Sequence, residues 1–227
     1  MSRNRYLIVF DYETDWDPNK LDQLGIVQIA AVPVDLRNLD ILIDEIFAID
    51  VKPADAHMPE YFAAHQQTIE WHSRQQNCSP QEVYERWLAG VPEKDAWDEF
   101  CKYIKGYAKS AKFDEMPMAG GQNIRGFDLP ITRRFGEKFN KKAPFSKRES
   151  DIIDLLDLST QWFMWADDKP KSYSLDSLRE FFGVDKFGAH DAKKDVIDCA
   201  DFIKRFLGIY ERIAPRINWR PEVLKNV

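Results

Sequence analysis

A short apolar run near the start of the chain ends in two acidic residues, and this stretch constrains the fold most. Residues 6–10 (Tyr-Leu-Ile-Val-Phe) show no polar alternation, which is typical of a strand buried on both faces. Side chains alternate along a strand, so Asp11 and Glu13 point to one face and Tyr12 to the other. Like charges about 4 Å apart repel by roughly 4 kcal/mol at an effective dielectric constant near 20. The pair therefore has to hold a proton or bind a cation, unless it only marks a polar strand end.

Length and composition indicate a soluble protein. The chain has 227 residues, 44% of them hydrophobic, and no segment approaches the roughly 18 apolar residues of a membrane span. Residues 1–5 lead into an apolar run that is too short for a signal peptide. We therefore expect a cytoplasmic protein that does not contact a membrane.

Cysteine usage and net charge narrow the function classes. The three cysteines are odd in number and widely spaced, which favours a reducing compartment and argues against structural zinc. The formal charge of -6 disfavours a protein that binds nucleic acid mainly by bulk electrostatics. A metal-dependent enzyme that acts on nucleic acid remains compatible with this charge, because bound cations neutralise clustered acids locally.

The residue pattern predicts an α/β protein. Predicted strands over 6–10, 25–34 and 41–51 are joined by short loops and indicate an antiparallel meander. A further strand is expected over 116–119, and another within 151–158 that runs into a helix. Helical segments are predicted over 68–75, 80–88, 93–108, 127–139, 174–182 and 191–207.

One stretch of the chain is strongly basic. Residues 133–148 contain seven Lys and Arg side chains against Glu137 alone. Such a run either guides a phosphate backbone or forms an ordinary solvated surface.

Two later stretches place acidic residues where helices are expected to begin. Asp128 precedes Leu129-Pro130 and has an ordinary interpretation as a helix N-cap. His190 and Asp195 converge if His190 lies in the loop before the last helix and Asp195 lies one turn inside it. The positive end of that helix disfavours a charged imidazolium, so His190 stays available as a base. The alternative is a surface histidine beside one of several exposed acids.

Together these motifs resemble those of the DEDDh branch of the DEDD exonuclease superfamily. Asp-x-Glu-Thr follows a buried strand, Phe-Asp opens a helix, and His-x-Ala-x-x-Asp opens the last helix, in the family's order across residues 10–207. Residues 52–55 and 154–157 look like the exonuclease I type within this family. Residues 68–71 and 126–130 look like the phage exodeoxyribonuclease A type. These two types imply a bacterial or phage origin.

The resemblance implies a ribonuclease H-like fold, in which helices flank a mixed central sheet. Acids from positions 11 to 195 must converge, so we expect one exonuclease domain over residues 1–210. Residues 211–227 are expected to form a C-terminal tail, irregular from about 212 onwards.

The resemblance also implies a 3′-to-5′ exonuclease that hydrolyses single-stranded DNA and releases nucleoside 5′-monophosphates. Carboxylate ligands suit two Mg²⁺ ions, with Mn²⁺ as a substitute, and not zinc. By family analogy, Asp11 bridges both ions, and His190 is the general base that takes a proton from the attacking water. The full set of metal ligands by this analogy is Asp11, Glu13, Asp128 and Asp195.

Three residues are expected to bind substrate. Thr14 offers its backbone to the terminal sugar, and Trp16 is placed to stack on the last base, unless it packs in the core. Asn123 belongs to the second motif. Family members often have Thr-Gly or Phe-Gly after Asp-x-Glu-Thr, where this chain has Asp15-Trp16. They also often have His-Asn-x-x-Phe-Asp, whereas here three residues separate Asn123 from Phe127.

Two other functions stay open at this point. The first alternative is an exoribonuclease that trims RNA ends or short oligoribonucleotides. The second alternative is a proofreading or binding subunit that docks on a polymerase through its tail, which contains Trp219.

Overall fold

A mixed β-sheet forms the centre of the computed structural model, which describes residues 5–16, 23–110, 115–186 and 190–213. The strands follow the order β5-β4-β2-β1-β6-β7, and β3 pairs with β2. Their bounds are β1 (Tyr6–Thr14), β2 (Ile26–Asp35), β3 (Asp40–Ile41), β4 (Phe47–Lys52), β5 (Val91–Pro92), β6 (Met118–Gly121) and β7 (Ile152–Asp154). The pairs β1–β2 and β2–β4 are antiparallel, which confirms the predicted meander. The pairs β1–β6, β6–β7 and β4–β5 are parallel.

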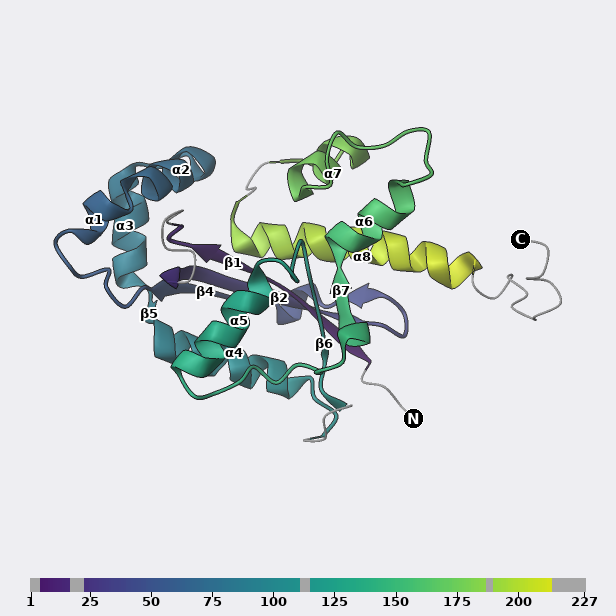
Figure 1. Ribbon diagram of the computed structural model, residues 1–227, viewed down its shortest axis with the longest axis horizontal. Coiled ribbons are helices and arrows are strands. Elements are labelled where there is room, and N and C mark those ends of the chain that lie inside the picture. Colours follow the sequence, from purple (N-terminus) through teal and green to yellow (C-terminus); the bar gives the residue numbers. More distant parts are fainter. Residues whose placement is uncertain (1–4, 17–22, 111–114, 187–189, 214–227) are drawn as a thin grey trace.

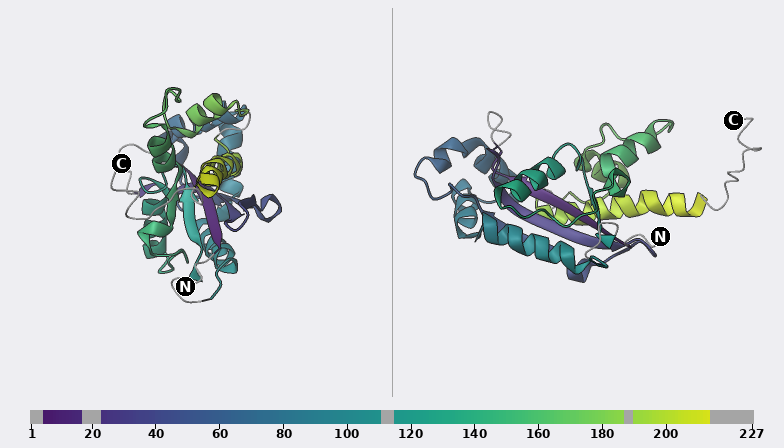
Figure 2. Two further views of the ribbon diagram at one scale, coloured as in Figure 1. Left: turned by 90° about the vertical axis from the view of Figure 1, so that its right-hand side faces the viewer. Right: turned by 60° about the horizontal axis from the view of Figure 1, so that its bottom comes forward.

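Helices cover both faces of this sheet (Figures 1 and 2). One core packs Ile8 and Phe10 of β1 against residues of α4 and α5, including Phe100. The other core packs Leu7 and Val9 against α6, α7 and α8. The helices are α1 (Tyr61–Ala64), α2 (Gln66–Gln76), α3 (Pro80–Ala89), α4 (Glu93–Gly106), α5 (Asp128–Lys138), α6 (Leu155–Phe163), α7 (Leu175–Phe182) and α8 (Ala192–Ile213). As the apolar run predicts, β1 is buried on both faces.

The first strand is longer than the apolar run that predicts it. It continues through Asp11 and Glu13 to Thr14, because β2 pairs with it along this whole length. Asp11 and Glu13 therefore extend the face of β1 that carries Leu7 and Val9. This is the face that packs against α8.

Helices α1, α2 and α3 group beside the carboxyl end of β1 (Figure 1). A small core that includes Tyr61, Ile69 and Trp87 holds the three helices together. The first turn of α3 is closed by a capping box between Ser79 and Glu82. This group of helices forms one wall of the space in front of the acidic strand end.

Two predicted strands are shorter in the structure. The segment 41–51 is split into β3, a 3-10 turn at 43–45, and β4. The adjacent acids Asp44 and Glu45 break the alternation of the strand, and the Glu45 carboxylate accepts a bond from the Tyr107 hydroxyl at 2.6 Å. In the segment 151–158, β7 ends at Asp154, whose carboxylate caps α6 by accepting from the Leu156 N–H at 3.0 Å.

The last helix extends beyond its predicted end at residue 207. It continues through Gly208 to Ile213, because Trp162 of α6 packs on both Phe206 and Tyr210. The expected tail over 211–227 therefore begins as helix. The rest of that tail, with Trp219, lies outside the described residues. None of the described helices is long and apolar enough to cross a lipid bilayer.

Candidate active site

Three predicted site residues lie together where β1 ends. Glu13 comes from β1, Asp195 from the first turn of α8, and His190 from the residues just before that helix. One potential ligand atom from each lies within 4.8 Å of the others. His190 and Asp195, the first and last residues of the motif His-x-Ala-x-x-Asp, thus both lie at the end of β1. This agrees with the prediction that the two converge when His190 precedes the last helix and Asp195 lies in its first turn.

Asp11 lies two residues before Glu13 on the same face of β1. Burial raises its pKa from the usual 3.8 to about 8, and repulsion from Asp195 adds to this shift, while Arg179 opposes it. A carboxyl group with such a pKa keeps its proton at neutral pH unless a cation compensates its charge.

Asp128 joins this cluster from the first residue of α5. The N-cap of that helix is Phe127, so the interpretation of Asp128 as an N-cap is wrong. Instead, its carboxylate accepts a hydrogen bond from the Tyr12 backbone N–H at 3.1 Å. Burial and the charge of Asp11 raise the pKa of Asp128 well above its usual value.

The four acids repel one another, so bound cations would relieve an unfavourable charge at this site. Burial raises the pKa of Glu13, and the charges of Asp11, Asp195 and Asp128 raise it further. The pKa of Asp195 is also raised by burial, although Arg179 lowers it in part. Converging carboxylate oxygens are the ligands that Mg²⁺ and Mn²⁺ prefer, and an imidazole nitrogen lies beside them. The donor set of Glu13, Asp195 and His190 therefore fits a divalent cation, and the charges of Asp11 and Asp128 interact with this set.

The backbone of His190 adopts an unusual conformation. Its φ angle is +65°, in the left-handed region that non-glycine residues rarely enter. Its N–H donates to the Asp195 carboxylate at 3.2 Å, which ties the residue to the first turn of α8. The imidazole therefore stands beside the acids and not on the outer surface.

Another histidine of this region has a different environment. His72 of α2 is buried, and burial lowers its pKa to about 4. Its Nε2 lies 3.4 Å from the Thr14 carbonyl oxygen. At neutral pH it is an uncharged packing residue that holds α2 against the end of β1.

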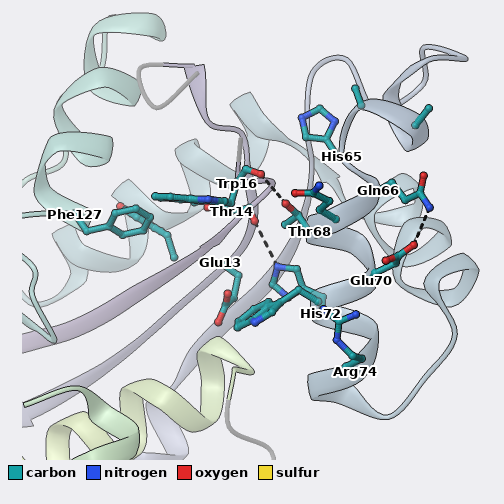
Figure 3. A pocket seen from close by; sticks show the side chains of 15 residues that line it. Glu13, Thr14, Trp16, His65, Gln66, Thr68, Glu70, His72, Arg74 and Phe127 are labelled. Atoms are coloured by element: carbon teal, nitrogen blue, oxygen red, sulfur yellow. Dashed lines mark hydrogen bonds between the residues drawn. The ribbon is translucent and has the colours of Figure 1, made fainter. Parts of the chain in front are cut away.

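A cavity of about 1110 Å³ opens between the end of β1 and α2. Ligand sites for small molecules usually measure about 300–1,000 Å³, so this space suits part of a larger ligand. Figure 3 shows Glu13, Thr14 and Trp16 on one side and residues of α2 on the other. Two of the three predicted substrate residues, Thr14 and Trp16, thus line the cavity.

Asp15, which replaces a residue typical of the DEDDh motif, anchors the end of β1 next to Trp16. Its buried carboxylate accepts from the Gly25 N–H at 2.6 Å and from the Tyr61 hydroxyl at 2.7 Å. The Thr68 hydroxyl donates to the carbonyl oxygen of Trp16 at 2.6 Å. With 44% of its surface exposed, Trp16 presents its ring to the cavity and does not pack in the core.

Asn123, the third predicted substrate residue, is not among the residues that line this cavity. It is exposed, has a φ of +52°, and its carbonyl oxygen accepts from the Gly126 and Phe127 N–H groups at 3.0 and 3.1 Å. A side chain at Gly126 would meet its Oδ1 at 2.6 Å. Asn123 therefore shapes the turn that delivers Asp128.

Much of the basic stretch over 133–148 takes part in structural contacts. Lys138 pairs with Glu93 at 2.5 Å, and Lys141 pairs with Asp98 at 2.5 Å. The guanidinium of Arg134 donates to the carbonyl oxygen of Leu24. These contacts favour a folding role for this stretch over a path for phosphates.

Comparison with known proteins identifies the fold. No protein-family model and no curated protein matches the sequence. Among solved structures, Escherichia coli exonuclease I in complex with a dT13 oligonucleotide matches with a TM-score of 0.64 and 19% identity, over 93% of this chain and 43% of that chain. The chain has the fold of exonuclease I. This is the predicted ribonuclease H-like arrangement of a mixed sheet flanked by helices.

Two further structures support this result. The zinc-bound form of the E. coli exonuclease I–ssDNA complex matches with a TM-score of 0.63 and 18% identity, over 93% of this chain and 41% of that chain. Cell-death related nuclease 4 matches with a TM-score of 0.66 and 17% identity, over 90% of this chain and 64% of that chain. The predicted resemblance to the DEDDh exonucleases is confirmed at the level of the fold. The chain spans less than half the length of the exonuclease I chains that it matches.

One residue of this exonuclease I fold was missed by sequence reasoning. Arg179 of α7 is fully buried beside the acidic cluster and pairs with Asp195 at 2.5 Å. The available signal is its place on the apolar stripe of α7 with Leu175, Leu178 and Phe182. A charged residue on such a stripe is rarely buried without an ionic partner.

Proposed function

We propose that this chain is a metal-dependent 3′-to-5′ exonuclease that hydrolyses single-stranded DNA. The observation that carries the proposal is the convergence of Asp11, Glu13, Asp128 and Asp195 with His190, on the fold of exonuclease I. An open cavity lies directly beside this convergence.

The four acids would hold two divalent cations, Mg²⁺ or Mn²⁺. When bound, these cations supply Lewis-acid activation of water and stabilise charge on the leaving oxygen. His190 takes the proton from the attacking water as general base. The water oxygen bonds to phosphorus, the bond from phosphorus to the 3′ oxygen of the preceding nucleotide breaks, and that oxygen takes a proton from solvent. The products are a nucleoside 5′-monophosphate and a strand shorter by one residue.

The cavity beside Glu13 suits the 3′-terminal nucleotide. Trp16 presents an exposed ring there, 6.1 Å from the ring of Phe127. Stacking of a base on an aromatic ring contributes about 1–3 kcal/mol and tolerates any base. Thr14 lines the same cavity, and by analogy with the DEDDh exonucleases its backbone would contact the terminal sugar.

Single-stranded DNA is favoured over RNA because several of the matched exonuclease I structures are complexes with DNA oligonucleotides. We include one domain over residues 1–210 and a cytoplasmic location in the proposal. The assay described next also decides whether the chain acts instead as a subunit that docks on a polymerase through the tail containing Trp219.

The test is degradation of 5′-labelled single-stranded DNA and RNA of one sequence, with Mg²⁺ or with chelator, by the wild-type chain and by Asp11→Ala. The expected result is a ladder that shortens from the 3′ end of DNA and is absent with the variant and with chelator. Faster loss of RNA would reassign the protein as an exoribonuclease. No degradation with Mg²⁺ or Mn²⁺ would contradict a free-standing nuclease, and recovery on adding a polymerase would indicate a subunit.

A further inference from the structure

The imidazole of His190 is held between two helices that are far apart in sequence. On one side, the ring of Trp71 of α2 contacts it edge-on, with centroids 4.7 Å apart. On the other side, its Nε2 lies 3.3 Å from a carboxylate oxygen of Asp176 of α7. The imidazole therefore contacts the ring of Trp71 and the carboxylate of Asp176, in addition to the acids at the end of β1.

Asp176 is itself held by the buried Arg179. The guanidinium contacts Asp176 at 2.8 Å, Asp195 at 2.5 Å and Asp198 at 2.8 Å. A guanidinium presents its N–H donors in a rigid planar fork, so it fixes the directions of several carboxylates at once. The buried Arg179 thus sets the positions of both acids that contact His190. These are Asp176, beside the imidazole ring, and Asp195, which accepts the His190 backbone N–H.

This arrangement bears on how His190 transfers protons. A neutral imidazole has one N–H donor and one acceptor nitrogen. A carboxylate that accepts the N–H fixes the tautomer and ring orientation and makes the other nitrogen a better base. Contacts between catalytic groups are often long before substrate binds, so a separation of 3.3 Å is compatible with such a role.

We propose that Asp176, fixed by Arg179, is a positioning residue that accepts the Nε2–H of His190 and leaves Nδ1 to take the proton from water. This inference rests on the proposed function and adds a residue to it. Asp176 contacts neither substrate nor cations in this role. It acts only through His190.

The kinetic test compares kcat and KM of the single variants Asp176→Ala and Glu180→Ala with those of wild type. Glu180 lies on the same helix and pairs at the surface with Lys171 and Lys186, so its removal is a matched control. Losing a partner of this kind typically lowers activity about 10- to 100-fold. We expect Asp176→Ala to lower kcat by this factor with unchanged KM, Asp176→Asn to recover part of kcat because its amide oxygen still accepts, and Glu180→Ala to match wild type.

Thermal unfolding of the same variants separates positioning from structural damage. The inference is overturned if kcat of Asp176→Ala equals that of Glu180→Ala. It is equally overturned if kcat falls only in proportion to the loss of folded protein at the assay temperature.

A second readout does not depend on activity. The chain has four histidines, so the imidazole N–H signal of His190 can be assigned in metal-free ¹⁵N-labelled protein by its loss in His190→Ala. We expect a protected Nε2–H signal in wild type and Glu180→Ala that is lost in Asp176→Ala. An unchanged signal in Asp176→Ala would overturn the inference. If wild type shows this signal but degrades no nucleic acid, the proposed function fails while the contact stands.

Discussion

The backbone N–H of Tyr12 donates a hydrogen bond of 3.1 Å to the carboxylate of Asp128, which lies 116 positions later in the chain. This bond attaches the start of α5 to the acidic end of β1. It places Asp128 beside Asp11 without any help from nearby sequence. It also means that Asp128 has a structural contact in addition to its proposed role as a metal ligand.

Two substitutions separate these roles of Asp128. Asp128→Ala leaves the buried Tyr12 N–H without an acceptor, so we expect the free energy of unfolding to fall by about 1–3 kcal/mol. Asp128→Asn keeps an acceptor oxygen and removes one repelling charge, so we expect little loss. Urea denaturation measures both values, and both variants should lack nuclease activity. Equal losses of stability in the two variants would show that the bond to Tyr12 contributes nothing.

The raised pKa of Asp11 predicts how stability depends on pH. Because the folded pKa of about 8 exceeds the usual 3.8, the folded state binds the proton more tightly than the unfolded state. Its contribution to stability is therefore complete below about pH 4 and is lost as pH rises through 8. Metal-free wild type should lose thermal stability between pH 5 and 8, and Asp11→Asn should lose less. A flat wild-type profile in differential scanning calorimetry would contradict this shift.

Divalent cations should reverse this loss. Ligands must be deprotonated to bind a cation, and a ligand that binds only the folded state stabilises it. We expect Mg²⁺ to raise the melting temperature of wild type more at pH 8 than at pH 5. Asp11→Asn should show a smaller rise at both pH values. An equal rise in wild type and variant would place the cation elsewhere.

Arg179 should be essential for folding as well as for the site. Its replacement by Met leaves three acids around a buried position without their cation, and breaking a buried ion pair typically costs about 3–5 kcal/mol. The matched control is Arg37→Met, which removes an exposed arginine from its 3.0 Å pair with Asp35 and should cost far less, because Arg5 still pairs with that carboxylate. Urea denaturation compares the two variants. Similar midpoints would show that the buried network adds no stability.

Trp16 should contribute to substrate binding and not to folding. Loss of stacking worth about 1–3 kcal/mol predicts that Trp16→Ala raises KM for single-stranded DNA by about 5- to 150-fold. Trp165 is 88% exposed and is not among the residues that line the cavity, so Trp165→Ala is the control and should leave KM unchanged. Both variants should unfold at the wild-type temperature. An unchanged KM in Trp16→Ala would remove Trp16 from the binding site.

The sequence by itself determined the local parts of this protein. The apolar run before Asp11 and Glu13 predicts a strand buried on both faces, and alternation along that strand predicts that both acids share a face. Both expectations depend only on neighbouring residues, and the structure confirms the burial of β1. The placing of His190 before the last helix and Asp195 inside it follows in the same way from helix geometry.

Tertiary structure alone decided how these parts meet. The role of Asp128 depends on Tyr12, the extension of α8 past Gly208 depends on Trp162, and the burial of Arg179 depends on acids from α8. Each of these contacts joins segments that are distant in sequence, and packing across such separations overrides the local preference for a cap, a helix end or an exposed arginine. The proposed pairing of His190 with Asp176 is of the same kind, because only the packing of α7 on α8 brings the two side chains together.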